Sequence, residues 1–293
     1  MSKRNSLIEL YRFLFALVVV KNHGMFPYTG PYIGPGRIAV EFFFVLSGYL
    51  LIKSLDKFME LPMMVGLFKF IFRKIKSMFI PLVIALCFNI FYKILIKDYS
   101  LDIWGYLWYV EKMLLFFIIY FVIRKIFKNT KTFWIITTGI FVICAIIHVI
   151  PMFYSWGLFR AGMAISLGML ISQIPPLKLK NKNILWIILI PIQIIICLIF
   201  IFGNNLLIEE ILDLILYPAL IYLTFQINYE IKIFNYLGSL SFGLYAFQCV
   251  VRPFEVFGLS NIWIMFGIIL TLSIIEDLVK RIIRFKKNKL SLQ

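Results

Sequence analysis

Apolar segments long enough to cross a lipid bilayer recur along the whole chain and are separated by short polar connections. A helix that crosses the hydrocarbon core of a bilayer needs about 20 apolar residues. The composition agrees, because 62% of the 293 residues are hydrophobic, whereas a soluble domain averages about half. We therefore predict an all-α, polytopic integral membrane protein in which residues 1–293 form a single transmembrane domain.

These segments predict about ten transmembrane helices. The first is expected to begin near Ser6, because the segment Ser6–Glu9 has the spacing of a capping box. It lacks a cleavage site of small residues, so we expect it to be retained. The longest polar connection, Lys53–Ser77, is expected to be a loop. The expected spans are 6–23, 38–52, 78–96, 107–123, 133–150, 159–173, 184–202, 208–226, 237–251 and 261–279.

The 30 lysines and arginines exceed the 14 acids by 16, and most of these cations lie in the short connections. Cytoplasmic connections of membrane proteins hold the excess of lysine and arginine. With alternate connections facing inward, 22 of the 30 cations lie on one side, together with both ends of the chain. We therefore expect a multi-pass protein of the cell (plasma or inner) membrane with both termini cytoplasmic. Nucleic acid is not an expected partner, and the four dispersed cysteines lack the paired spacing of a metal site.

Arg12 and His23 lie in the first apolar segment and are eleven residues apart. At roughly 100° and 1.5 Å per residue, this step is nearly three full turns and about 16 Å, so both side chains share one helix face. A cation inside a membrane is costly unless it meets a partner or a water-filled cavity, which makes Arg12 a functional candidate. The alternatives are an arginine that extends to the interface and a histidine wetted by the following loop.

Glu41 stands near the start of the second apolar segment, at the same expected membrane face as His23. An acid at this place is suited to orient the imidazole of a general base. The alternative is a carboxylate favoured by the positive end of the helix dipole. Ser47 and Gly48 follow on the same segment, where small residues usually allow helices to pack closely.

Arg12, His23 and the segment Glu41–Tyr49 together resemble the opening of the acyltransferase 3 family of membrane-bound acyltransferases. The resemblance implies that His23 is the catalytic base and that Arg12 positions the acyl donor. It also implies that Glu41 is the acid of this family pattern, and that Ser47 belongs to the Ser-Gly pair near the donor.

Arg73, Lys74 and Lys76, which precede Pro81, resemble the basic segment before the third helix of this family, with Ser77 where another arginine is expected. The resemblance implies that these cations bind the phosphates of coenzyme A. A cytoplasmic connection rich in cations would have the same composition.

Further matches lie at Trp108, Tyr109 and Arg160. The two aromatic rings are expected to stack on sugars of the acceptor, although membrane interfaces also collect tryptophan and tyrosine. Arg160 matches a weaker family pattern and is a second cation inside an apolar segment, which we group with the donor-binding residues.

The late segment that contains Ser241, Tyr245 and Gln248 resembles the Gly, Ser and Tyr region of the family and is expected to contact the acceptor. Many members have histidine where this chain has Gln248, whose amide can donate and accept hydrogen bonds but cannot titrate. We therefore expect Gln248 to form hydrogen bonds rather than carry a proton. His148 matches no family histidine, and we interpret it as structural.

The resemblance implies a membrane O-acyltransferase that moves an acyl group, most simply acetyl from acetyl-CoA, to a hydroxyl of a cell-surface or exported polysaccharide. Its expected partners are acyl-CoA, a glycan or lipid-linked saccharide acceptor, and membrane lipids, with no metal ion. Two other functions fit many spans with buried cations: a transporter or flippase for lipid-linked saccharide, and a non-enzymatic membrane subunit of a polysaccharide synthase.

Overall fold

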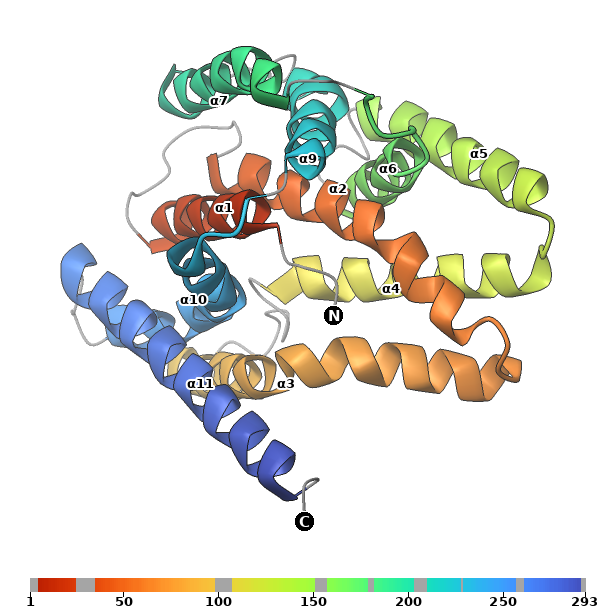
Figure 1. The fold of residues 1–293 in the computed structure, drawn as a ribbon. Coiled ribbons are helices and arrows are strands. Elements are labelled where there is room, and N and C mark those ends of the chain that lie inside the picture. Colours follow the sequence, from red (N-terminus) through yellow and green to blue (C-terminus); the bar gives the residue numbers. More distant parts are fainter. Residues whose placement is uncertain are drawn as a thin grey trace. The chain divides into compact units, whose positions relative to one another are not determined.

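The computed structural model describes residues 5–24, 35–97, 107–150, 157–178, 182–202, 210–227, 229–256 and 261–290. Within these ranges every regular element is a helix, and no strand occurs (Figure 1). The prediction of an all-α fold is therefore confirmed. The main helices are α1 (Ser6–Gly24), α2 (Pro35–Leu55), α3 (Met63–Ile96), α4 (Trp108–Ile126), α5 (Thr130–Val149), α6 (Gly157–Ile171), α7 (Leu185–Phe202), α9 (Tyr217–Gln226), α10 (Lys232–Val256) and α11 (Ile262–Leu290).

A helix overlaps each of the expected spans, and several helices extend beyond the expected bounds. Among the described residues, two helical segments are both long and apolar enough to cross a membrane, Met78–Ile96 and Thr130–Val149. The number of spans and the cytoplasmic position of the termini stay predictions.

The expected loop at Lys53–Ser77 is wrong, because most of this segment is helical. Helix α2 continues to Leu55, the short helix η1 covers Asp56–Phe58, and α3 begins at Met63. Lysine and arginine are good helix formers, and apolar residues alternate with them here at helical spacing. In this region the cations show where the apolar stretch ends, but the helix continues through them.

The first helix begins at Ser6 as predicted, but its cap is a different residue. The side chain of Asn5 accepts hydrogen bonds from the backbone N–H groups of Leu7 (3.1 Å) and Ile8 (3.3 Å). Asparagine is a favoured N-cap because it satisfies N–H groups that have no partner within the helix. Ser6 is thereby left to contact another helix.

The chain forms two compact units, divided within α3 between Lys76 and Ser77. The first unit contains residues 1–28, 77–107 and 230–293, and the second contains residues 29–76 and 108–229. Each unit is described by itself.

In the first unit, α1 and α10 run in parallel. The Ser6 hydroxyl donates to the Asn235 side chain (3.1 Å) and accepts from the backbone N–H of Ile231 (2.8 Å). One turn further along both helices, Glu9 lies against Gly238. Residue numbers therefore rise together along the pair.

Helices α10 and α11 run in opposite directions. Gly243 lies against Ser273, whereas Tyr236, two turns earlier in α10, has its ring 5.0 Å from the Arg281 guanidinium, two turns later in α11. The two helices therefore form an antiparallel pair.

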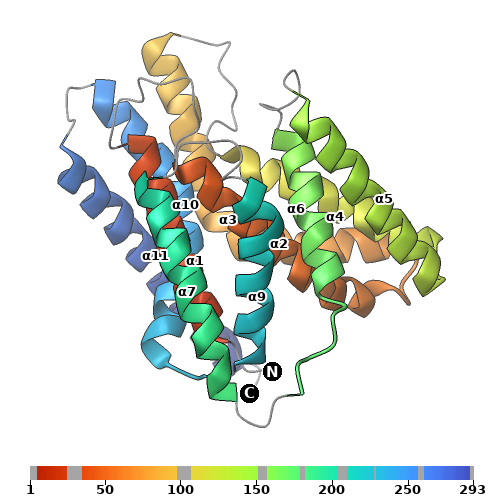
Figure 2. The same cartoon turned by 90° about the horizontal axis from the view of Figure 1, so that it is seen from above.

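In the second unit, ten of the fifteen residues of α6 are buried, and α2 crosses this helix at two glycines. A side chain at Gly48 would overlap the Ile165 carbonyl, and one at Gly168 would overlap the backbone at Val45. Helix α5 packs along another side of α6, as Figure 2 shows. The absence of side chains at the crossing lets the two backbones touch, as small residues do between membrane helices.

The other contacts of this unit give the helix directions. Trp108 at the start of α4 lies against Gly157 at the start of α6, and Tyr120, later in α4, contacts Ser166, later in α6. Phe42 and Tyr49 of α2 contact, in the same order, Tyr217 and Phe225 of α9. Helix α4 is therefore parallel to α6, and α2 is parallel to α9.

Candidate active site

Arg12 has an acidic partner on its own helix. Its Nη1 lies 2.8 Å from Glu9 Oε2, three residues earlier in α1. Glu9 is buried against Gly238 of α10, where any side chain would overlap the carboxylate. Glu9 thus supplies the partner that an arginine in an apolar helix requires. Glu9 is not among the site residues predicted from the sequence, although its spacing of three from Arg12 is the signal for such a pair.

His23 lies in the last turn of α1, and its side chain is outside the described residues. Helix α1 is continuous from Ser6 to Gly24. The continuous helix that would place Arg12 and His23 on one face is therefore present between them. The role of His23 stays a prediction.

Ser241, Tyr245 and Gln248 follow one another on one face of α10, at the spacing of four and then three residues that defines a helix face. All three are buried. The Ser241 hydroxyl donates to the Gly238 carbonyl (2.8 Å) of its own helix. These three of the expected acceptor-binding residues therefore form a polar row inside the first unit.

Gln248 is unusual in this row, because neither its amide oxygen nor its amide nitrogen has a hydrogen-bond partner among the described residues. Its side chain is only 2% exposed. An amide buried without partners costs about 1–3 kcal/mol for each unsatisfied group. The Gln248 amide therefore has hydrogen-bonding capacity that no described residue uses.

Because α1 and α10 run in parallel, the position of Gln248 along α10 can be compared with the position of His23 along α1. Glu9 is level with Gly238, and both helices rise about 1.5 Å per residue. Gln248 lies ten residues beyond Gly238, and His23 lies fourteen residues beyond Glu9. The orphaned amide and the backbone of His23 therefore lie toward the same end of this helix pair, within roughly 6 Å along its length.

Glu41 and Arg160 form a buried ion pair between α2 and α6 in the second unit, through Glu41 Oε1 and Arg160 Nη2. The Arg160 guanidinium also lies 5.7 Å from the centre of the Trp108 ring. Glu41 Oε2 has no hydrogen-bond partner among the described residues. The acid expected beside His23 thus has an arginine partner, and the arginine expected at the donor has a carboxylate. Breaking such a buried pair from one side leaves an uncompensated charge, which is strongly destabilising.

Ser47 and Tyr109, expected to serve different substrates, contact each other across α2 and α4. Their hydroxyls are 3.2 Å apart, and both lie near Met113 Sδ. The Tyr109 ring is buried with its centre 4.6 Å from that of Phe44. This packing favours a structural role for the Tyr109 ring over stacking on a sugar.

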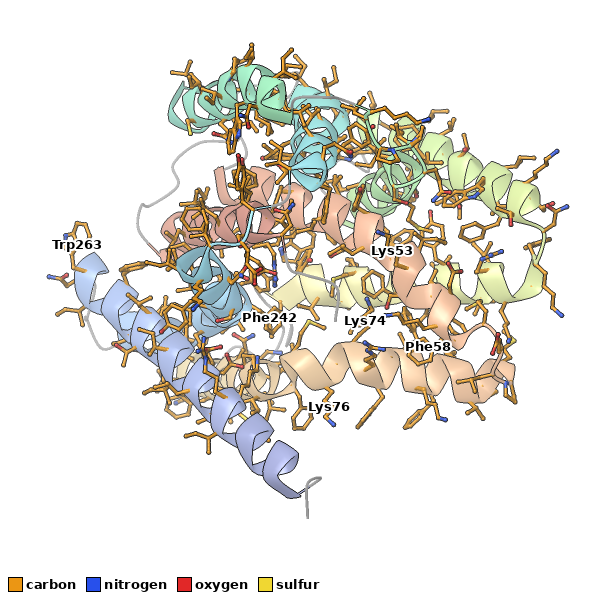
Figure 3. All side chains as sticks on the ribbon, in the orientation of Figure 1. Lys53, Phe58, Lys74, Lys76, Phe242 and Trp263 are labelled. Atoms are coloured by element: carbon orange, nitrogen blue, oxygen red, sulfur yellow. The ribbon has the colours of Figure 1, made fainter. Side chains whose placement is uncertain are left out.

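The three cations expected to bind coenzyme A divide between two sides of α3. Lys74 is partly buried, with its Nζ 4.8 Å from the centre of the Phe117 ring and 5.5 Å from that of Phe70. Burial, with the charges of Arg73 and Lys57 adding to it, lowers the pKa of Lys74 to about 8. Arg73 and Lys76 are exposed, and Figure 3 shows Lys74 and Lys76 on opposite sides of α3.

Two cations at the end of α4 hold the connection between α2 and α3. The Lys125 ammonium donates to the carbonyls of Met59 and Leu61. Arg124 lies 3.7 Å from the Asp56 carboxylate. These contacts tie the connection to the end of α4, whereas the sequence alone assigned both cations only to membrane topology.

His148 is buried in α5, with its Nε2 3.3 Å from Glu210 Oε1. This partner accounts for a buried histidine without any role in catalysis. The interpretation of His148 as a structural residue agrees with this geometry.

The chain matches the family model of an acyltransferase domain over residues 5–275. Comparisons with curated proteins and with solved structures find no match. The family match spans nearly the whole chain, including α1, the α2–α6 pair and about the first half of α11. The chain therefore belongs to the acyltransferase 3 family, and it is an acyltransferase with an all-helical fold.

Proposed function

We propose that this protein is a multi-pass O-acyltransferase of the cell membrane. It transfers an acetyl group from acetyl-CoA to a hydroxyl of a cell-surface or exported polysaccharide, or of its lipid-linked precursor. The observation that carries the proposal is the α1–α10 pair, which holds Arg12 with its Glu9 partner and brings the orphaned amide of Gln248 to the His23 end. Family membership supports acyl transfer, and the donor and acceptor are the finer part of the proposal.

The reaction assigned to this pair begins when His23 takes the proton of the acceptor hydroxyl. The hydroxyl oxygen then forms a bond to the thioester carbonyl carbon, and the carbon–sulfur bond breaks. The leaving thiolate of coenzyme A receives the proton from the imidazolium, so that the products are an ester and free coenzyme A. A histidine with an ordinary pKa near 6.5 is suited to both proton transfers at neutral pH.

Arg12 is proposed to bind the donor with the part of its guanidinium that Glu9 does not occupy. The side chain of Arg12 is 32% exposed, and the guanidinium carries five N–H donors, of which the contact with Glu9 uses one end. Glu9 would fix the orientation of this planar group, because paired hydrogen bonds need a defined geometry.

Lys74 is proposed to bind a phosphate of the donor. Its lowered pKa comes chiefly from burial, so an anion beside it would restore the stability of the charged form. The neighbouring Phe70 and Phe117 rings offer an aromatic surface. Arg73 and Lys76, which lie exposed on another side of the helix, do not share this setting.

The helix directions within each unit support the ten-span topology. If successive spans alternate, α1 and α10 must be parallel to each other and antiparallel to α11, as their contacts require. By the same rule α2, α4, α6 and α9 must all run in one direction. The parallel pairs α4–α6 and α2–α9 follow this rule. Glu41 and Arg160 are in contact, and each lies nearly two turns before the α2–α6 crossing on its own helix, so α2 and α6 run in the same direction.

The test is acetyl transfer by the purified full-length protein in lipid bilayers, measured as free coenzyme A thiol and as added acetyl mass on the glycan. His23→Ala should lower the rate by about 10²-fold to 10⁴-fold, the usual effect of a lost general base. His148→Gln is the matched control, because it removes the other of the two histidines and should leave transfer largely intact. Arg12→Lys should raise the acetyl-CoA requirement, since lysine keeps the charge but not the planar fork.

Wild-type rates in a well-folded His23→Ala protein would remove the catalytic assignment. Movement of a saccharide across the bilayer without thioester consumption would assign transport in place of acyl transfer. Activity that needs a second protein would identify the chain as a subunit of a larger synthase.

A further inference from the structure

The first part of α3, residues 63–76, has one face packed into the second unit. Phe70 is fully buried, and its ring stacks with that of Phe121 at a distance of 5.4 Å. Gly66, four residues earlier, lies on the same inner face, where an added Cβ would be 3.0 Å from the Phe121 ring and 3.0 Å from the Phe58 carbonyl oxygen. Lys74, four residues later, continues this inner face.

The opposite face exposes a row of large apolar side chains. Met64 is 74% exposed, Phe68 is 71% exposed and Phe72 is 55% exposed, each four residues after the one before. The Phe68 and Phe72 rings stack on each other with their centres 6.0 Å apart. At roughly 100° per residue, this row is centred about 160–180° from Phe70, directly away from the rest of the unit.

A band of exposed cations lies beside this row. Lys69, Arg73 and Lys76 are exposed and fall within about 60° of one another around the helix axis. Lys76 Nζ lies 6.0 Å from the centre of the Phe72 ring, which joins the band to the apolar row. Residues 63–76 contain no acid. The outward surface of this segment, called here the α3 surface, is therefore apolar on one side and purely cationic on the other.

The position of the α3 surface in the chain indicates that it contacts a lipid bilayer. Two residues after Lys76 the same helix enters Met78–Ile96, which is long and apolar enough to cross a membrane. A helix with large apolar side chains on one side and lysine or arginine beside them lies in the headgroup region of a bilayer, with its apolar side buried about 5–10 Å. Cations at such a surface bind the phosphates of anionic lipids.

We propose that the α3 surface binds an anionic lipid leaflet, with Met64, Phe68 and Phe72 inserted at the boundary between headgroups and acyl chains and with Lys69, Arg73 and Lys76 on the lipid phosphates. The inference rests on the membrane location in the proposed function, and it does not depend on acyl transfer. It separates two groups of cations that are adjacent in sequence: Lys74 faces the inner side of the helix, whereas Arg73 and Lys76 face lipid.

The experiment places an environment-sensitive fluorescent amino acid at position 68 of the full-length protein, in bilayers of phosphatidylcholine with increasing phosphatidylglycerol. Nitroxide-labelled lipids with the label at a shallow or a deep position of the acyl chain then report the depth of the probe. We expect a blue-shifted emission, quenching that is stronger for the shallow label, and an increase of both with phosphatidylglycerol. The same probe at Lys128, an exposed position in the α4–α5 connection, should stay in water.

The charge component is tested with Arg73→Gln/Lys76→Gln against the matched control Lys128→Gln/Lys131→Gln, which removes two exposed cations elsewhere in this unit. A cation near an anionic surface contributes about fivefold in affinity, so the first pair should need several-fold more phosphatidylglycerol to reach the same emission shift, and the control pair should not. In the unmodified chain, salt should weaken the phosphatidylglycerol effect, because it screens charges over about 10 Å at 0.1 M.

Three results would overturn the proposal. Stronger quenching by the deep label would make residues 63–76 part of a membrane-crossing segment. A probe shielded from water but not quenched by either lipid would mean that a protein covers the surface. If both glutamine pairs needed the same amount of phosphatidylglycerol, or if salt had no effect on the emission shift, the α3 surface would not bind anionic lipid. None of these measurements needs an acyl donor, so each can fail while acyl transfer is intact.

Discussion

At the scale of single residues, the buried polar side chains of the two units have different settings. Glu41 and Arg160 neutralise each other, and His148 has Glu210. Gln248 is equally buried but has no hydrogen-bond partner among the described residues. Substitution of Gln248 therefore tests whether its buried amide serves a substrate.

We predict that Gln248→Leu makes the protein more stable and less active. An apolar side chain of similar size removes an unsatisfied amide, whose burial costs about 1–3 kcal/mol, while it also removes the hydrogen bonds available to a substrate. Thermal unfolding in detergent and acetyl transfer should therefore change in opposite directions. Gln248→His should retain part of the activity. Full activity in the leucine variant would show that the amide has no role in the site.

We predict that donor binding depends on pH through the protonation of Lys74. An anionic phosphate binds the protonated lysine, whose pKa is about 8 in the free protein. The contribution of Lys74 to donor affinity is therefore complete below this pKa and falls above it, by at most about tenfold per pH unit. Titration of acetyl-CoA binding from one unit below to one unit above the pKa measures this fall.

The variant Lys74→Arg keeps its charge across this range and should flatten the pH profile. The control is Lys69→Arg, an exposed lysine of the same helix, which should follow the profile of the unmodified protein. If Lys74→Arg keeps the original slope, another group causes the pH dependence.

At the scale of helices, the α2–α6 crossing holds the second unit together through backbone contact at Gly48 and Gly168. The same crossing brings Glu41 to Arg160. Its geometry therefore determines both packing and the placement of a buried ion pair.

We predict that Gly48→Ala and Gly168→Ala each lower the melting temperature. The added methyl group would overlap backbone atoms, which cannot move aside without separating the helices, and overpacking of this kind costs about 1–3 kcal/mol. For a chain of this length, this corresponds to roughly 2–4 °C per kcal/mol. Gly139→Ala in α5 is the control, because a Cβ there meets nothing within 4 Å and alanine favours the helix. An equal effect at all three glycines would contradict the close crossing.

At the scale of the whole molecule, the topology is the property that most constrains the reaction. We predict ten spans with both termini cytoplasmic, because 22 of the 30 cations then lie on the inner side. The test uses a reporter fused after Gln293, which lies outside the described residues, and a membrane-impermeant thiol probe on a cysteine introduced at Lys182. Both should be accessible only from the cytoplasm. External labelling of either position would overturn the topology.

The sequence by itself determined the helical class, the ranges of the apolar segments and the face shared by Arg12 and His23. These are local properties, because they depend on hydrophobic length and on the period of a single helix. The same local reasoning failed at Lys53–Ser77, where cations at helical spacing resemble a polar loop. It also named Ser6 as the cap, although the neighbouring Asn5 fills that role.

Only the tertiary structure decided which groups meet. Glu41 and Arg160 are 119 residues apart, and no period along the chain relates them. The burial of Glu9 depends on Gly238, and the inner position of Lys74 depends on Phe117 of another helix. The packing of α10 decided that Gln248 is buried with no hydrogen-bond partner among the described residues. Contacts between distant segments depend on which helix faces touch, and a helix sequence specifies its own faces without specifying the neighbour that will cover them.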